Sequence, residues 1–346
     1  MSGEPNTPGA NERANFSEHP DRTLVSEVGP VTATGPDPEL PAVTELPRRT
    51  GRLRLYARRF WRNKPAVVGL VIFLVLVLAA LIGGHLSPFS YNEMDFSALA
   101  APPGTKGSVL GADGTLVNGT HWFGTNAGGL DLFAMLMHGL GRSLTIALSV
   151  SLLTTLIAAF LGAMAAYLGG WGERAILAVI HFLLILPSFL LLALVANHFS
   201  GSWQILIVVL VLFGWMLPAR VIWQLSTSIR EREFISAARF MGVRGPAVVM
   251  RHMVPNIGSL LVIQFVLGVV STVMTETGLS FLGFGVKIPD ISLGVLLQDG
   301  VNAISSAPWI FWFSAGTLTL LTVSMSLISD GLRDALDPNS AAGGTA

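Results

Sequence analysis

The feature that most constrains this chain is a series of six apolar stretches, each close to twenty residues long. A helix rises about 1.5 Å per residue, so about 20 apolar residues can cross the roughly 30 Å of hydrocarbon in a bilayer. Within the stretches, the only Asp, Glu, Lys or Arg residues are Arg220, near one end, and Glu276. Because backbone groups in lipid must bond to one another, the sequence predicts an all-α, polytopic membrane protein with six transmembrane helices. The expected spans are residues 66–84, 143–168, 175–196, 203–222, 257–278 and 309–329.

Composition agrees with a membrane protein and removes several classes of function. Hydrophobic residues make up 51% of the 346 residues and charged residues only 12%, whereas soluble domains carry about 25% charged residues. The formal net charge is zero, so no global field favours nucleic acid as a partner. The chain has no cysteine, which excludes disulfides, cysteine-ligated zinc and iron–sulfur clusters.

The first 50 residues differ from the rest of the chain. They contain eight prolines, eight acidic residues and few large apolar groups, and such a segment cannot offset the entropy cost of ordering. We expect a disordered cytoplasmic tail at 1–50, a basic juxtamembrane segment at 51–64, a six-span domain at 65–339 and a flexible C-terminus at 340–346. A signal peptide is not expected, because the first apolar run begins near residue 65.

The basic residues predict the orientation of the spans. Five arginines and a lysine lie within residues 51–64, immediately before the first span. With the N-terminus inside, 18 of the 21 Lys and Arg residues fall on the cytoplasmic side, as the positive-inside rule requires. We therefore expect a multi-pass protein of the cell membrane with both termini in the cytoplasm. The outer segments would then be residues 85–138, as a small ordered cap, and residues 279–307, while the cytoplasmic loop would be residues 224–256.

The cytoplasmic loop begins with the pattern of an amphipathic helix. Phe234, Ala237, Ala238 and Met241 recur at helical spacing, which predicts a single apolar face. Gly242 follows and permits a turn that residues with a Cβ atom resist.

A second helix is expected after this turn. Pro246 suits its first turn, because the missing N–H of proline would be unpaired there, and Pro255 precedes the return to the membrane. On physics alone, an amphipathic connector lying on anionic headgroups explains the loop as well as a docking element does.

The order of small residues in this loop resembles the EAA loop of ABC-importer permeases. The family pattern is Glu-Ala-Ala, three residues, Gly, and nine residues before Ile-x-Leu-Pro. Four residues of this chain match by position, whereas Ser236 stands where the family usually has Glu. In that family the loop is the coupling helix, seated in a groove of the cytoplasmic ATPase. The resemblance implies an ATPase-coupling loop that includes Glu233, Ser236, Ala237, Ala238, Arg239, Gly242 and Pro255.

Further segments extend the resemblance over about residues 51–339. Together they are most similar to the second, C-type, permease subunit of the dipeptide, oligopeptide and nickel importers. In the segment at 122–144, Asn126 and Leu130 stand where the family usually has Asp and Arg. The segments are WFGTNAGGLDLFAMLMHGLGRSL (122–144), ILPSFLLLAL (185–194), ETGLSFLGFGV (276–286) and ISDGLRDALDPN (328–339).

The resemblance implies a type I ABC-importer permease architecture and a function. The chain would be a pore subunit of an ATP-driven, binding-protein-dependent importer, with di- or oligopeptides favoured over nickel, glutathione or oligosaccharide as cargo. Its partners would be a homologous B-type permease, two cytoplasmic ABC ATPases, an extracytoplasmic solute-binding protein and membrane lipid. No cofactor is expected in this chain, since ATP and Mg²⁺ would be held by the ATPases.

Motifs of catalysis are not found in the sequence. Its three lysines are followed by Pro65, Gly107 and Ile288, so no Gly-Lys-Ser/Thr phosphate loop exists. The histidines do not form His-Glu-x-x-His or another metal spacing, and Gly-x-Ser-x-Gly is missing. We therefore expect neither an enzyme nor a metal site. An ion-driven secondary carrier or a membrane scaffold is the alternative, although such carriers commonly have several intramembrane ionisable groups and inverted repeats.

Two polar residues and one proline stand out within the spans. Glu276 could lie on the translocation pathway, or it could anchor the neighbouring outer segment by hydrogen bonds, and the second reading is favoured. Gln264 lies three turns earlier on roughly the same face, so the two residues could form a polar stripe. Pro187 is expected to kink the third span.

Overall fold

The computed structural model is helical throughout the residues it describes, apart from loops and a two-stranded hairpin, which confirms the all-α prediction. The predicted tail at 1–50 and the predicted C-terminus at 340–346 lie outside the described residues. The described residues are 52–110, 115–198, 202–287 and 289–336.

Among the described residues, four helices are each long and apolar enough to cross a membrane alone. Two pairs of helices, each joined at a sharp bend, bring the number of spans to six if each pair counts as one span. The polytopic architecture predicted from the sequence is thereby confirmed. The single helices are α2 (Lys64–Leu86), α3 (Leu132–Leu168), α11 (Gly258–Phe281) and α13 (Pro308–Leu336), and the bent pairs are α4 (Gly170–Ile185) with α5 (Ser188–His198) and α6 (Trp203–Gly214) with α7 (Met216–Arg230).

Proline accounts for both bends. α4 and α5 meet at 75° on either side of Pro187, so the kink predicted there is confirmed. The second bend, of 41°, separates α6 from α7 at Trp215. Pro218 follows in the first turn of α7 and has no N–H to donate to the carbonyl of Gly214, which removes a hydrogen bond across the break.

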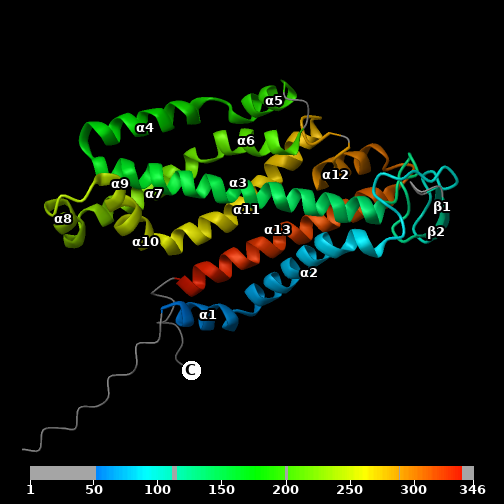
Figure 1. Cartoon of the computed structure of the whole chain (residues 1–346), viewed down its shortest axis with the longest axis horizontal. Coiled ribbons are helices and arrows are strands. Elements are labelled where there is room, and N and C mark those ends of the chain that lie inside the picture. Colours follow the sequence, from blue (N-terminus) through cyan, green and yellow to red (C-terminus); the bar gives the residue numbers. More distant parts are fainter. Residues whose placement is uncertain (1–51, 111–114, 199–201, 288, 337–346) are drawn as a thin grey trace, which may run out of the picture. The chain divides into compact units, whose positions relative to one another are not determined.

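α3 lies at the centre of the bundle and packs on α7, α11 and α2 (Figure 1). Gly162 lets α3 and α7 approach closely, because a Cβ atom there would lie only 2.5 Å from the carbonyl oxygen of Ala219. Gly69 does the same between α2 and α13, where its Cβ would lie 2.8 Å from the carbonyl oxygen of Ser324. Close contacts of this kind are typical of helices that associate in lipid.

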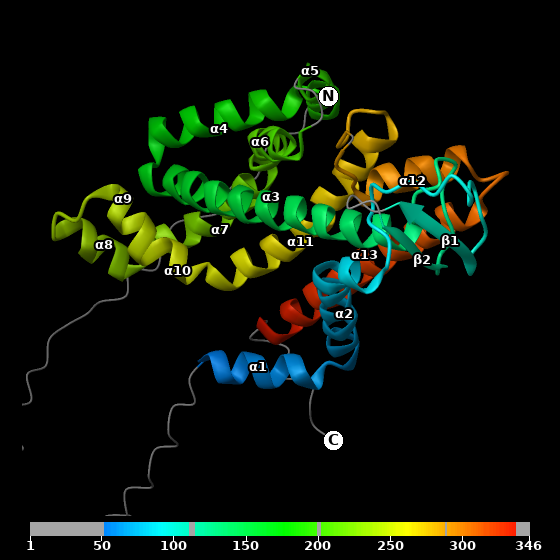
Figure 2. The same ribbon diagram turned by 45° about the vertical axis from the view of Figure 1, so that its right-hand side comes forward.

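The segment between α2 and α3 forms a cap (residues 87–131) at one end of the bundle. β1 (Thr105–Leu110) pairs antiparallel with β2 (Leu116–His121), with Thr105 opposite His121 and Leu110 opposite Leu116. The sequence predicts an ordered cap here but not its strands. The short helix α12 (Leu293–Asn302) lies at the same end of the bundle (Figures 1 and 2).

The segment between α7 and α11 forms an elbow (residues 233–256) at the opposite end of α3 from the hairpin (Figures 1 and 2). Near the N-terminal end of the described chain, α1 (Arg52–Arg62) runs across the end of α2 (Figure 2). The elbow contains α8 (Glu233–Phe240), α9 (Gly245–Val248), the π-helical turn η1 (Val249–Met253) and α10 (Val254–Asn256).

Candidate functional site

The elbow turns at Gly242. The φ angle of this residue is +74°, in the left-handed region that favours glycine. Its N–H donates to the carbonyl of Arg239 at 2.9 Å, and the N–H of Val243 donates to the carbonyl of Ala238 at 3.1 Å. These bonds end α8 and satisfy carbonyl groups that the helix would otherwise leave unpaired. Pro246 then lies in the first turn of α9, as expected.

The helix α8 buries the face that carries Ile235 and Ala238. Ile235 and Ala238, 0% and 2% exposed, pack into a core cluster together with Val248. Phe234 and Met241, predicted to share the apolar face with Ala238, are 39% and 76% exposed. The spacing predicts an apolar face but not which face of α8 packs on the bundle, because spacing within a helix does not identify its neighbours.

The remaining residues of the predicted coupling loop lie on the surface of the elbow. Glu233, Ser236 and Ala237 are exposed in α8, and Pro255 is exposed in α10. The C-terminal end of α8 continues this surface with Phe240, which is 91% exposed. Large apolar side chains exposed together on a protruding segment are typical of a surface that contacts another protein.

Arg239 joins the elbow to the end of α3. Its guanidinium lies 4.2 Å from the centre of the Tyr167 ring and also donates a hydrogen bond to the carbonyl of Tyr167. A cation over an aromatic ring contributes about 0.5–1 kcal/mol at an exposed site. Because Tyr167 belongs to the last turn of α3, a movement of α8 would be felt directly at this helix.

A cavity of about 440 Å³ opens between α3, the bend of α4 and α5, the bend of α6 and α7, and α11. Gln264 lines it, together with Ser271 and Thr275 on α11 and Thr154 on α3. Among the described residues that line it, hydroxyl, amide and apolar groups occur and ionisable side chains do not.

Glu276 does not line this cavity, so the structure does not bring Gln264 and Glu276 together there. The Glu276 side chain is buried, and its Oε1 accepts the hydroxyls of Ser280 at 2.7 Å and Ser292 at 2.6 Å. Ser292 also caps the N-terminus of α12. These contacts favour the anchoring reading of Glu276 over the pathway reading.

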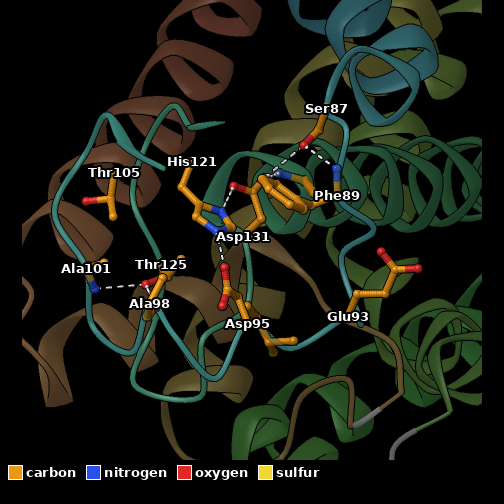
Figure 3. A network of polar contacts seen from close by, with 12 residues as sticks. Ser87, Phe89, Glu93, Asp95, Ala98, Ala101, Thr105, His121, Thr125 and Asp131 are labelled. Atoms are coloured by element: carbon orange, nitrogen blue, oxygen red, sulfur yellow. Dashed lines mark hydrogen bonds and ion pairs between the residues drawn. The ribbon is translucent and has the colours of Figure 1, made fainter. Parts of the chain in front are cut away.

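A buried network of ionisable side chains holds the cap together, and sequence reasoning missed it (Figure 3). His121 at the end of β2 is fully buried, with Nδ1 2.8 Å from an oxygen of Asp131 and Nε2 3.3 Å from an oxygen of Asp95. Its ring stacks on Phe89 with 4.2 Å between centroids. Since both ring nitrogens face carboxylate oxygens, both can donate only when the imidazole carries two protons.

The two aspartates attach this network to the rest of the chain. Asp131 caps α3 by accepting the N–H of Ala134 at 2.9 Å. Burial of Asp95 acts to raise its pKa, but hydrogen bonds from Ser97, His121 and Ser108 outweigh burial and hold this pKa below its ordinary value. The one sequence signal was Asp131, in the segment that resembles the family motif before the second span.

Comparison with known proteins gives two family matches and several relatives. Residues 158–341 match the family described as binding-protein-dependent transport system inner membrane component. Residues 51–103 match the N-terminal TM domain of oligopeptide transport permease C. The oligopeptide transport system permease protein OppC of Mycobacterium tuberculosis is 44% identical to this chain over 291 residues, or 84% of this chain and 95% of that protein.

More distant relatives also match over more than four fifths of this chain. A putative peptide permease protein of Brucella suis is 34% identical over 296 residues, which make up 85% of this chain and 93% of that protein. The oligopeptide transport system permease protein OppC of Haemophilus influenzae is 30% identical over 281 residues, or 81% of this chain and 86% of that protein.

Proposed function

Because the chain belongs to the family of binding-protein-dependent transport system inner membrane components, we propose that it forms one half of the transmembrane route of an ATP-driven peptide importer. The chain is a membrane-embedded permease component, not an enzyme. The proposal adds its cargo, its partners, its orientation and the way in which ATP drives it.

The observation that carries the proposal is the elbow. It protrudes at the opposite end of α3 from the cap and exposes Phe240 and Met241 beside the turn at Gly242. A ligand or partner can shift an equilibrium only through contacts that differ between the two states. An exposed elbow, linked through Arg239 to α3, offers a partner such contacts.

In this mechanism the elbow lies in the cytoplasm and two ABC ATPases grip the elbows of this chain and of a homologous B-type permease. The ATPases hold ATP and Mg²⁺, and this chain holds neither. ATP binding brings the ATPases together, the elbows follow, and the bundle changes from inward- to outward-facing. A loaded solute-binding protein releases its cargo at the cap end, where both larger outer segments lie.

Two observations support di- or oligopeptides as the cargo. The relatives at 44% and 34% identity are named as oligopeptide and peptide permeases. The described residues that line the cavity carry hydroxyl, amide and apolar groups and no charge, which suits cargo that shares a peptide backbone but varies in side-chain charge. Of the two residues predicted on the translocation pathway, Gln264 lines this cavity, and we place it on the route of the cargo.

Cysteine crosslinking tests the elbow directly, because the chain has no cysteine of its own. Single cysteines at exposed positions 236, 237 and 241 should crosslink to an ATPase subunit in the assembled transporter. A cysteine in place of Leu110, which is exposed in β1 of the cap, is the matched control and should not. Crosslinks only to lipid from all three elbow positions would overturn the coupling proposal.

Two substitutions test the same point by function. Gly242→Pro removes the left-handed turn, and Ala238→Asp puts a charge into a site that is 2% exposed. Both should abolish uptake and assembly with the ATPase, while Ser236→Ala, at an exposed site, should retain both.

Other tests separate the alternative functions. An ion-driven carrier would instead transport without ATP, and no ATPase subunit would copurify with it. A peptide-dependent growth test, comparing a deletion strain with its parent, separates peptides from nickel, glutathione and oligosaccharides.

A further inference from the structure

Three layers of side chains follow one another along α3 from the bundle centre toward the cap. Thr154 and Thr155 line the cavity. About one turn nearer the cap, Val150 also lines the cavity and belongs, together with Ile146, to a buried apolar cluster. One turn further on, Arg142 pairs with Asp290, which lies between α11 and α12.

The same order of layers occurs along the bent pair of α6 and α7. Leu217 lines the cavity, Leu206 and Val209 join the apolar cluster, and Trp203 begins α6 beside Arg142. Since two elements show the same order, the cavity is closed toward the cap first by an apolar layer and then by a polar one.

The apolar layer is made by four helices and one loop. Its buried members come from α3, α5, α6 and α11, and Val286 contributes from the loop that follows α11. Leu279, the member from α11, is 0% exposed. These buried side chains lie between the cavity and the polar layer, on the side of the cavity that faces the cap.

The polar layer centres on the guanidinium of Arg142. Its Nη2 and Nε lie 2.5 Å and 3.1 Å from one oxygen of Asp290, and the group stacks over the Trp203 ring at 4.4 Å. The same Asp290 oxygen is 3.3 Å from Nε2 of His138, whose ring stacks on Tyr91 of the cap. The side chains of Arg142 and Asp290 are only 21% and 24% exposed, which makes the pair stronger than a fully exposed one.

Asp290 is held firmly to α3 and α11 by its neighbours in sequence. The hydroxyl of Ser292 donates to Glu276 at 2.6 Å, and the N–H of Leu293 donates to the hydroxyl of Ser143 at 3.0 Å. By contrast, Trp203 on α6 meets the polar layer through its stacking on Arg142. Arg142 is therefore a polar link between α6 and the loop that carries Asp290.

We propose that Arg142, Asp290 and Trp203 form a latch that keeps the route closed at the cap end. The proposal rests on the proposed function, which makes the cavity part of a route that must open to the outside. When the bundle turns outward, α6 has to move away from the loop that carries Asp290, and the guanidinium must then lose one of its two partners. The strength of this link sets how often the cap end opens without ATP.

Cysteine labelling in the assembled transporter tests the latch. A single reporter cysteine replaces Ser271, an exposed residue of the cavity lining, in a chain otherwise free of cysteine. A membrane-impermeant maleimide is added from the cap side in the absence of nucleotide. Arg142→Gln and Asp290→Asn should each raise the labelling rate by about tenfold or more, because a closed state held by this pair loses population when the pair is removed.

Two further variants make the test specific. Trp203→Leu keeps an apolar side chain next to the cluster but removes the stacking on Arg142, so it should also raise the labelling rate. If the Arg142→Gln protein does not accumulate in the membrane, the labelling rate of Trp203→Leu decides whether the latch exists. Lys287→Gln removes an exposed cation three residues from Asp290 and should leave the rate unchanged.

Labelling measured with and without ATP distinguishes an error in the latch proposal from an error in the proposed function. If trapping with ATP and vanadate raises labelling but the latch variants label at the parental rate, the closure lies elsewhere and the latch is overturned while the importer stands. If ATP does not change labelling of the parent, the coupling to ATPases is overturned, and the ratio of variant to parent without nucleotide still decides the latch.

Discussion

Replacing Asp131 by alanine is expected to loosen the cap. The carboxylate of Asp131 accepts the N–H of Ala134 at 2.9 Å and the hydroxyl of Ser87 at 3.2 Å, and it pairs with His121 at 2.8 Å. The substitution removes the N-cap of α3 and leaves a fully buried imidazole nitrogen facing a methyl group.

The magnitude follows from these lost contacts. Loss of an N-cap costs about 1 kcal/mol, and a buried polar group without its partner costs about 1–3 kcal/mol. The free energy of opening the cap should therefore fall by about 2–4 kcal/mol, which lowers the hydrogen-exchange protection of its amides about 30- to 900-fold. Asp131→Asn should have an effect smaller by about 1 kcal/mol, because asparagine caps helices about as well as aspartate.

Hydrogen exchange read by mass spectrometry measures this effect in the purified transporter. Peptides from β1 and β2 should lose protection, whereas those from α8 in the same sample should not. Asn63→Ala is the matched control, since Asn63 caps α2 by accepting the N–H of Ala66 at 3.1 Å but touches no buried histidine. If Asp131→Ala leaves β2 within about threefold of the parental protection in normally inserted protein, the network does not hold the cap, and the reasoning is refuted.

Three further outcomes are expected. Gly107→Ala should loosen the cap as well, because its Cβ would lie 2.1 Å from Asp95 Oδ2, whereas Gly128→Ala, whose Cβ meets Asn126 at 3.4 Å, should not; hydrogen exchange compares the two. Because the pKa of Asp95 is lowered in the folded cap, its ionised carboxylate stabilises the cap at pH values above about 3.9, the ordinary pKa of aspartate. Protection of β1 should therefore fall as the pH drops below about 4, and Asp95→Asn should remove most of that fall. Glu276→Gln should retain uptake and membrane abundance, because an amide oxygen still accepts the hydroxyls of Ser280 and Ser292; lost uptake at normal abundance would instead place Glu276 on the pathway.

The spans and the kink at Pro187 could be predicted from the sequence because they depend on local properties, whereas the bend at Trp215 was not predicted. A run of about 20 apolar residues has few alternatives to a helix in lipid. Pro187 breaks its span because proline removes a hydrogen bond wherever it stands. The turn at Gly242 is local as well, since it needs only a residue that tolerates a positive φ.

The cap network and the buried face of α8 could not be predicted in this way. Asp95 lies 26 residues from His121 in the sequence, and Asp131 lies 10 residues from it. The three side chains meet only because the segments that carry them fold onto one another. Likewise, Ile235 is buried in a cluster with residues of α3, α7, α9 and η1, and no periodicity within α8 encodes these contacts. Both features depend on tertiary contacts between polar or apolar groups whose partners the sequence does not identify.

The uninterrupted length of α3 has a mechanical consequence. Its 37 residues run from the cap residue Asp131 to the turn that holds Tyr167 beneath Arg239, a rod of about 55 Å. A stiff rod of that length acts as a lever: a tilt of about 5° imposed at one end displaces the other by about 5 Å. Arg142 lies about 37 Å along this rod from Tyr167, so the same tilt would displace it by about 3 Å, enough to break its hydrogen bonds to Asp290.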